Sequence, residues 1–353
     1  MEYAQYIGID LHRRYFQVCA MAPDGTRRWE ARFGATAADV AALVSRGVAG
    51  SAVAVEASGP TWRFVDELTP HVARVVVVDP AKTRLKAGFA AKTDRLDARR
   101  LADALRRDSV VGIYVPSPPI REYREVTRVH RTLVRVSTGL KQRLHALVLR
   151  HRLEAPAVSD LFAAPGLAWL QTVALPPRAR QARDLLLALW QQVAAREQSL
   201  RAEIGRLAAA DPAVRAIDPI PGIGPVLGLL IRAEVGDVHR FPTGGALASY
   251  AGLVPRVASS GGRTRYGRIT KTGSPYLRWA LIEAALQAPR RHDAVGRWTR
   301  RLAVRKNALT ARTAAARRVC DELVAAWRAV ARSSQDAAAR TEGDSVRVDA
   351  VVS

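Results

Sequence analysis

The chain has 353 residues, and its 55 Lys and Arg against 32 Asp and Glu give a formal net charge of +23. A hydrophobic content of 48% excludes a chain that is disordered throughout, and the presence of only two cysteines, Cys19 and Cys320, excludes a disulfide scaffold. Because like charges repel each other in a compact fold, so large an excess favours a polyanionic partner, and nucleic acid is the first candidate. The alternative is an arginine-rich surface that only keeps the protein soluble.

Neither a targeting segment nor a membrane segment is expected. The N-terminus lacks a basic stretch followed by an apolar run, and every apolar stretch is far too short to cross a bilayer. The two cysteines also suit a reducing compartment. The sequence therefore predicts a soluble, cytoplasmic protein with no membrane partner.

Residues 1–116 alternate between strand and helix patterns. Strands are predicted at 3–12, 16–22, 28–33, 51–57 and 73–79, with helices at 36–45, 61–68 and 94–107. Three successive strands, followed by alternating helices and strands, predict an α/β domain with a mixed sheet covered by helices. This order is typical of ribonuclease-H-like folds, and also of sugar-kinase and actin-like ATPases.

Residues 117–210 are predicted to form a helical arm. Apolar residues recur there in steps of three and four, which indicates two helices with heptad-like seams. The seams are Val126, Val129, Leu133, Val136, Leu140, Leu144 and Leu147, and then Leu186, Leu189, Val193, Leu200, Ile204 and Leu207. A proline-rich loop separates the two stretches, so an antiparallel coiled-coil arm is the simplest arrangement, whether for internal packing, for oligomerisation or for both.

Residues 211–332 are predicted to form a mainly helical C-terminal domain. It contains a Pro-Gly-Ile-Gly-Pro turn at 221–225 and a basic segment rich in glycine and serine at 255–274. Residues 333–353 are small and polar with scattered charges, and we expect them to form a disordered tail.

Two carboxylates on predicted strands are candidate metal ligands. Asp10 shares one face of the first strand with Gly8, and Glu56 ends the fourth strand. A carboxylate inside a buried strand is costly unless a cation pairs with it. For each acid alone, an arginine or a neighbouring helix is the alternative partner.

The helix at 94–107 contributes two more acids. Asp94 and Asp97 lie on its apolar, inward stripe, whereas Asp103 lies on the arginine-rich face. Two like charges directed at a core repel each other, and a divalent cation offsets that repulsion; oxygen ligands suit Mg²⁺ or Mn²⁺. The alternative is that both are helix N-terminal acids favoured by the dipole, with Thr93 as N-cap.

Together, the four acids predict a two-metal site for phosphodiester chemistry, in which one ion activates the nucleophile and the other stabilises the leaving oxygen. The ATPase alternative requires glycines after the first aspartate, so that the backbone can approach a phosphate. Here bulky side chains follow Asp10, at Leu11, His12, Arg13 and Arg14. That pattern disfavours a phosphate loop.

Several motifs resemble the DEDD-type insertion-sequence transposases, relatives of the Piv DNA invertase. In the N-terminal domain they are Gly-Ile-Asp-Leu-His at 8–12, Glu-Ala-Ser-Gly-Pro at 56–60 and Lys-Thr-Asp-Arg-Leu-Asp-Ala at 92–98. In the C-terminal domain they are the turn at 221–225, Tyr-Ala-Gly-Leu-Val-Pro-Arg at 250–256, Ser-Gly-Gly at 260–262 and Ile-Thr-Lys-Thr-Gly at 269–273. The resemblance spans about residues 3–285 in the family's order.

The resemblance implies a RuvC-like N-terminal domain whose acid tetrad falls on Asp10, Glu56, Asp94 and Asp97. It implies a serine nucleophile in the C-terminal domain, which falls on Ser260. Members of the family recombine DNA as homo-oligomers, and many are directed by a structured bridge RNA that pairs with donor and target DNA. A dimer or tetramer and a non-coding guide RNA are therefore the implied partners, besides donor and target DNA.

The segment before the serine departs from the family pattern. It reads Arg256-Val257-Ala258-Ser259, where a polar or aromatic residue is commoner. The adjacent Ser259 also leaves the position of the nucleophile ambiguous by one residue.

The C-terminal domain concentrates positive charge. Between Arg256 and Lys306 there are 13 Lys and Arg against two acids, and uniform solubilisation would not gather charge in this way. The turn at 221–225 resembles a helix-hairpin-helix turn, whose N–H groups hold backbone phosphate; a helix connection without a ligand is the alternative. The predicted nucleic-acid-binding residues are Lys92, Gly222, Gly224, Arg256, Arg263, Arg265, Arg268, Lys271 and Arg278.

Three functions are compatible with these features. The favoured one is an insertion-sequence DNA transposase, which cleaves and exchanges strands with divalent metal and a serine nucleophile under the direction of a guide RNA. The second is a RuvC-like structure-specific endonuclease that uses metal-bound water. The third is a non-enzymatic nucleic-acid-binding protein, which the four intact acids disfavour.

Overall fold

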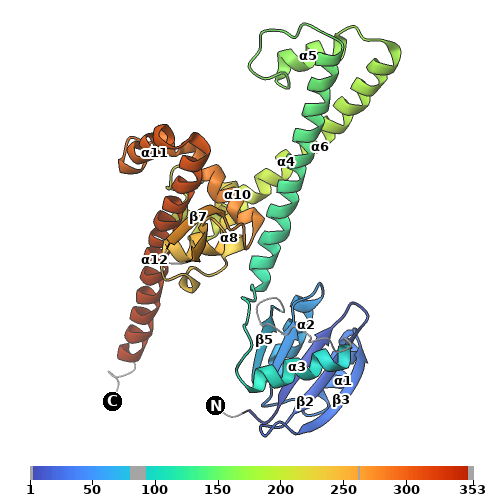
Figure 1. Cartoon of the computed structure of the whole chain (residues 1–353), viewed down its shortest axis with the longest axis vertical. Coiled ribbons are helices and arrows are strands. Elements are labelled where there is room, and N and C mark those ends of the chain that lie inside the picture. Colours follow the sequence, from blue (N-terminus) through green and yellow to red (C-terminus); the bar gives the residue numbers. More distant parts are fainter. Residues whose placement is uncertain (1–2, 80–92, 261–262, 349–353) are drawn as a thin grey trace. The chain divides into compact units, whose positions relative to one another are not determined.

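The computed structural model describes residues 3–79, 93–260 and 263–348, and for residues 260, 263 and 331–348 it describes the backbone alone. The chain forms two compact units, residues 1–116 and residues 117–353 (Figure 1). Each unit is described by itself below.

The first unit is built on a five-stranded mixed sheet (Figure 1). Its strands are β1 (Tyr6–Leu11), β2 (Tyr15–Met21), β3 (Arg27–Gly34), β4 (Ala52–Glu56) and β5 (Arg74–Val78). The order is β3-β2-β1-β4-β5; β2 is antiparallel to its neighbours β1 and β3, while β1, β4 and β5 are parallel. The mixed sheet that the sequence predicts is confirmed.

Helices cover both faces of this sheet. α1 (Ala37–Val44) and α2 (Thr61–Leu68), which is followed by a short 3-10 turn (Thr69–His71), pack with Ile7 and Ile9 of β1 into one core. α3 (Asp94–Arg106) packs on the opposite face against β1, β2 and β4, and its Leu101 and Leu105 share an apolar cluster with Val76 and Val78 of β5. Because side chains alternate along a strand, Gly8 and Asp10 belong to the face that α3 covers.

Gly8 allows a very close contact between β1 and α3. A Cβ atom at this position would lie 2.1 Å from the carbonyl oxygen of Ala98 and 2.4 Å from the backbone nitrogen of Ala102. Only glycine therefore lets the backbone of α3 lie directly on β1. This contact fixes the first turn of α3 beside the end of β1 that carries Asp10.

The second unit begins with a helical arm (Figure 1). α4 (Pro118–Arg150) and α6 (Pro177–Ala210) pack along each other, and α5 (Ala164–Thr172) packs on both near the end of the arm. The apolar cluster at that end includes Leu144, Phe162 and Trp190.

The predicted seams of the arm are wrong at several positions. Val129 and Val136 of α4 are 51% and 42% exposed, whereas His130 and Ser137 are buried against the rest of the unit. Trp190 of α6 donates its indole N–H to the Ser137 hydroxyl at 3.2 Å, which satisfies that buried polar group. The first half of α4 thus buries a different side from the one that its apolar period favours, whereas Leu140, Leu144 and Leu147 of the predicted seam are buried.

The orientation of this half of α4 is set by its contact with α8 (Pro225–Val235). Arg124 donates to the carbonyl oxygen of Ala233 at 2.8 Å, and Arg128 donates through two nitrogens to the Glu234 carboxylate at 2.9 and 3.2 Å. Glu234 is only 2% exposed, so its charge needs this partner. A heptad pattern within α4 contains no information about such a distant pair.

The rest of the second unit is mainly helical, as the sequence predicts. Besides α8, its elements are α7 (Pro212–Ile217), α9 (Gly244–Tyr250), α10 (Pro275–Ala284), α11 (Ala294–Arg305), α12 (Ala308–Val348) and the 3-10 turns Val238–Arg240 and Ala285–Arg290. One large apolar cluster, in which α8, α9, α10 and α12 take part, forms its core. An antiparallel hairpin, β6 (Pro255–Ser260) and β7 (Arg263–Ile269), lies within the basic segment.

Two boundaries differ from the expected ones. α12 continues to Val348, into the tail predicted to be disordered. A segment rich in alanine and polar residues extends an existing helix far more easily than it nucleates a new one. The boundary expected at residue 211 lies inside the second unit, where Asp211 caps α7 and accepts a hydrogen bond from Arg232 of α8 at 3.0 Å. In the described part of the chain, no helix has the length and apolar character needed to cross a membrane.

Replacing Gly8 tests the contact between β1 and α3. Gly8→Ala should force α3 away from the sheet and lower the free energy of unfolding of the first unit by about 1–3 kcal/mol, the usual effect of overpacking. Gly59→Ala is the matched control, since a Cβ there meets nothing within 4 Å. Urea denaturation of the full chain measures both, and equal stability of the two variants would contradict the close contact.

Candidate active site and nucleic-acid-binding surface

Two of the four predicted acids lie at neighbouring positions on one edge of the sheet. Ile9 of β1 pairs with Val55 of the parallel strand β4, so the residues that follow them, Asp10 and Glu56, occupy adjacent positions on the α3 face. Asp10 is 8% exposed, and Glu56 is partly buried. The expectation that two strand acids approach each other is consistent with this register.

The other two acids lie in the first turn of α3. Thr93 caps the helix, and its hydroxyl accepts a hydrogen bond from the Leu96 N–H at 3.3 Å. The side chain of Asp94 is 44% exposed and that of Asp97 is 16% exposed, so only Asp97 faces inward to the extent that the wheel predicts. Asp97 also forms an ion pair with Arg100 at 3.3 Å.

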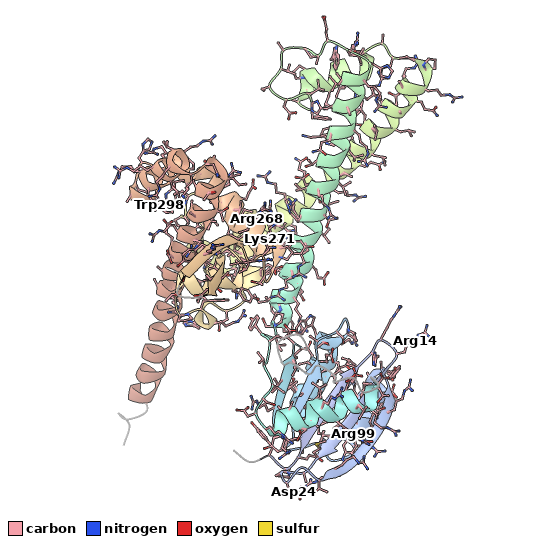
Figure 2. The ribbon with its side chains drawn as sticks, viewed as in Figure 1. Arg14, Asp24, Arg99, Arg268, Lys271 and Trp298 are labelled. Atoms are coloured by element: carbon pink, nitrogen blue, oxygen red, sulfur yellow. The ribbon has the colours of Figure 1, made fainter. Side chains whose placement is uncertain are left out.

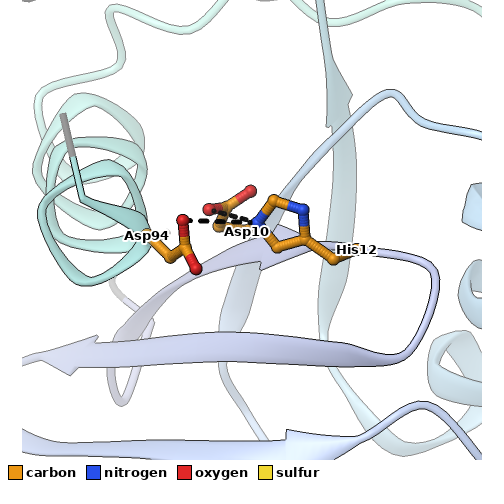
Figure 3. Close-up of side chains that lie close together, drawn as sticks. All are labelled: Asp10, His12 and Asp94. Carbon is orange, nitrogen blue, oxygen red and sulfur yellow. Dashed lines mark hydrogen bonds and ion pairs between the residues drawn. The ribbon is translucent and has the colours of Figure 1, made fainter.

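The side chain of His12 lies between Asp10 of the strand pair and Asp94 of the helix pair (Figure 3). The Nε2 atom of His12 lies 3.1 Å from Oδ2 of Asp10 and 3.5 Å from Oδ1 of Asp94. The Tyr15 hydroxyl donates to Oδ2 of Asp94 at 2.7 Å. One imidazole nitrogen thus lies between two carboxylates, and a phenol holds the outer one in place.

The two carboxylates experience opposite environments. Burial raises the pKa of Asp10 above its usual range, and the nearby charges of Asp94 and Asp97 add to this effect, while His12 opposes it. The hydrogen bond from Tyr15 lowers the pKa of Asp94, and His12 contributes in the same direction. Asp10 is therefore the carboxylate with the greater need for a nearby cation.

Ligand atoms of Asp10, His12 and Asp94 all lie within 4.8 Å of one another, and in the described part of the chain this is the one such group of potential metal ligands. Two carboxylates and an imidazole, with one carboxylate largely buried, form a donor set that fits a divalent ion. Glu56 and Asp97 lie outside this closest group, although the charge of Asp97 acts on Asp10.

Sequence reasoning missed His12 and Tyr15. The signal for His12 is the period of two along a strand, which places it on the same face as Asp10 as soon as β1 is assigned. Tyr15 begins β2, across the tight β1–β2 connection, and no local pattern connects it with Asp94, 79 residues away.

The hairpin of the second unit carries the basic side chains predicted to contact nucleic acid. Arg256 on β6 and Arg265 on β7 are exposed. Arg268 on β7 and Lys271 just beyond it are exposed as well, and both are labelled in Figure 2. The backbone of Ser260, at the end of β6, pairs with that of Arg263 at the start of β7. Lys92 lies outside the described residues.

Glycines lock the two loops at the base of this hairpin. A Cβ on Gly252 would lie 2.3 Å from the carbonyl oxygen of Thr272, and one on Gly273 would lie 2.0 Å from that of Tyr250; both glycines have positive φ. Arg278 donates to the carbonyl oxygens of Ala251 and Thr272 at 3.1 and 3.2 Å. Arg278, predicted as a nucleic-acid ligand, therefore holds the loops together.

The turn at 221–225 connects α7 to α8. Gly222 has φ +94°, and a Cβ there would lie 2.2 Å from the carbonyl oxygen of Ala284, so this glycine serves close packing against α10. Gly224 is the N-cap of α8 and has open space around it. The arrangement leaves Gly224 as the glycine of this turn that a ligand can approach.

Comparison with known proteins gives matches in both units. Residues 7–152 match the DEDD transposase family of IS110, and residues 214–300 match the family described as "Transposase IS116/IS110/IS902 family". A "Probable family 20 transposase" of Pseudomonas aeruginosa is 30% identical over 72% of this chain and 78% of its own length. The "Transposase for insertion sequence element IS1111A" of Coxiella burnetii is 25% identical over 81% of this chain and 78% of its own length.

These matches place the chain in the class of DNA-acting enzymes known as transposases. It belongs to the IS110/IS116/IS902 family of insertion-sequence transposases, and DNA is its substrate.

Replacing the buried acid should separate metal binding from folding. Because the pKa of Asp10 is raised in the folded protein, the stability linked to its protonation is complete below the unfolded-state pKa and is lost as the pH rises through the folded-state pKa. At pH 7 in EDTA, Asp10→Asn should therefore raise the stability of the first unit by about 0.5–2 kcal/mol, the range of single stabilising substitutions. This advantage should shrink as the pH falls toward the pKa of Asp10, as followed by thermal unfolding.

The same assay with Mn²⁺ supplies the metal-dependent arm. The natural chain should gain stability with Mn²⁺, and Asp10→Asn should not. Asp24→Asn, in the exposed turn between β2 and β3 (Figure 2), is the control and should respond as the natural chain does. An undiminished Mn²⁺ response of Asp10→Asn would contradict the site.

Proposed function

We propose that Asp10, Glu56, Asp94 and Asp97 hold Mg²⁺ or Mn²⁺ and that the first unit uses this centre to cleave and join DNA strands during transposition. The observation that carries the proposal is the convergence of Asp10 and Asp94 on one imidazole nitrogen, with Asp10 largely buried. A divalent ion bound there supplies Lewis-acid stabilisation of the negative charge that develops on the phosphate oxygens.

Residues around the acids organise the site before any ligand arrives. Before an ion binds, His12 contacts both carboxylates and offsets part of their mutual repulsion, and the same side chain completes the close group of potential ligands. Tyr15 orients Asp94 through its 2.7 Å hydrogen bond and is itself held by Arg32, whose guanidinium lies 3.6 Å from the centre of the Tyr15 ring. Such preorganisation lowers the reorganisation needed when the phosphodiester binds.

Ser260 is the proposed nucleophile, on the strength of the family resemblance. In this step, the serine hydroxyl loses its proton, its Oγ forms a bond to the DNA phosphorus, and one deoxyribose oxygen leaves and takes up a proton. The exposed Arg256 and Arg265 on the same hairpin supply positive charge for the phosphate. Action as a dimer or tetramer and direction by a structured guide RNA belong to the same proposal.

A metal-dependent endonuclease that uses water is the second candidate. The observation in its favour is that the close group of Asp10, His12 and Asp94 is complete within the first unit, without any residue of the second. In that case, a serine in the hairpin is dispensable and no covalent adduct forms.

Loss of one acid should abolish strand cleavage. With the full chain and a supercoiled plasmid that carries the DNA flanking its own coding region, Asp94→Asn should reduce cleavage at least about 100-fold, as expected when transition-state stabilisation is lost. EDTA should have the same effect on the natural chain. Gel analysis of nicked and linear products measures both, with Asp24→Asn as control; full cleavage in EDTA would rule out a metal-dependent reaction.

Paired serine variants separate the two candidate reactions. Ser260→Ala should abolish the covalent protein–DNA adduct on denaturing gels and leave DNA binding unchanged, whereas Ser259→Ala should still form the adduct. Loss of the adduct only in Ser259→Ala would move the nucleophile by one residue. Cleavage by both variants without any adduct would support hydrolysis by water.

A further inference from the structure

A pocket in the second unit, which shares no residue with the hairpin or the acid cluster, has the chemistry of a nucleotide site. It is a half-open pocket of about 220 Å³ between α4 and α10, and its lining residues are Arg131, Thr132, Arg135, Pro275, Tyr276 and Trp279. Two arginines come from α4, and two aromatic side chains come from the first turns of α10. The pocket is thus cationic on one side and aromatic on the other.

The two arginines are available to an anion. Arg131 and Arg135 lie four residues apart, on the same side of α4, and Arg135 is exposed. Among the residues that the structure describes, neither forms an ion pair with a carboxylate. The guanidinium of Arg131 lies 4.2 Å from the centre of the Trp279 ring, so its charge is held over the aromatic wall.

The aromatic wall is rigid. Tyr276 and Trp279 are three residues apart on α10, both are partly buried, and both pack on the main core of the unit. Arg128 lies 4.9 Å from the centre of the Tyr276 ring and is fixed by its bidentate contact with the buried Glu234. The binding surface is therefore preformed, and the entropic cost of ordering its side chains when a ligand binds is small.

Size and chemistry together select the ligand. A volume of about 220 Å³ is smaller than the roughly 300–1,000 Å³ of typical small-molecule sites, and it suits one planar ring system with an attached anion. Every base has a π-face that stacks on an aromatic ring, and its phosphate pairs with arginine.

The geometry points to a site for one unpaired nucleotide of a DNA or RNA strand. Its base stacks on the guanidinium of Arg131, which Trp279 holds from behind through a cation–π contact, and its phosphate pairs with Arg135. This site goes beyond the strand-cleavage proposal, because no residue of the acid cluster or of the hairpin takes part in it. It gives the transposase a means of holding a strand that has left its duplex.

The test measures strand binding by the full chain in EDTA, where metal-dependent cleavage does not interfere. The probes are fluorescent strands of about 12 nucleotides: oligo(dT), oligo(U) and an abasic strand with the same number of phosphates. Trp279→Ala should weaken binding of the two base-containing strands at least about fivefold, the lower end of base stacking, and leave abasic binding unchanged. Comparison of oligo(dT) with oligo(U) shows whether DNA or RNA is the preferred source.

Arg135→Ala should weaken binding of all three strands and lower the slope of log K against log salt by about 0.7, the value for one phosphate of a single strand. Arg143→Ala removes an exposed arginine eight residues further along α4 and should change little. Trp298→Ala removes a tryptophan that pairs with Arg318 at 5.5 Å outside the pocket, and it is the matched control for Trp279→Ala (Figure 2).

Trp279→Phe distinguishes stacking from a loss of folding, since it keeps an aromatic face and should restore most of the binding of base-containing strands. Circular dichroism confirms that each variant is folded. Equal effects of Trp279→Ala and Trp298→Ala, or equal losses on abasic and base-containing strands, would overturn the site. Cleavage activity is not measured here, so failure of this proposal leaves the strand-cleavage proposal untouched.

Discussion

The close packing of α3 on β1 is the constraint on which the acid cluster depends. Without a side chain at Gly8, the backbone of α3 lies against the strand, and Leu101 and Leu105 bury their side chains on the same face of the sheet. This burial drives the contact, because removal of apolar surface from water is the dominant favourable contribution to folding. Asp94 is brought to Asp10 as a consequence, although the two negative charges oppose the approach. Hydrophobic packing of α3 on the sheet thus assembles the site, although the carboxylates that it brings together repel each other.

The two carboxylates, Asp10 and Asp94, do not experience the same electrostatic environment. Burial raises the pKa of Asp10, whereas the hydroxyl of Tyr15 lowers the pKa of Asp94. His12, between them, offsets part of the repulsion through one nitrogen but leaves Asp10 with a raised pKa. Clusters of carboxylates with shifted pKa values are characteristic of functional sites, where a bound substrate or cofactor compensates the charge that the protein alone does not.

The sequence predicts those parts of the site that follow from local periods. The alternation of side chains along β1 is sufficient to place Gly8 and Asp10 on one face of the sheet. The same rule places His12 beside them, but a prediction that considers only acidic residues as metal ligands does not select this histidine. Contacts between distant residues carry no such signal. The orientation of the first half of α4 follows from Arg128 and Glu234, 106 residues apart, so the apolar period alone predicts the wrong seam there. The mixed sheet was predictable because each strand and helix has a local pattern of apolar residues that indicates its type.

The two units carry local clusters of opposite charge. The first unit presents a cluster of acids that needs a cation, and the second presents a hairpin of exposed arginines and a pocket with Arg131 and Arg135 that need anions. His12 and Arg100 offset only part of the charge of the acid cluster, and the net charge of +23 leaves the whole chain with an excess of cations. A nucleic-acid phosphate with its associated divalent cations satisfies both at once. The electrostatic imbalance that composition alone reveals therefore agrees with the DNA substrate that membership of the transposase family implies.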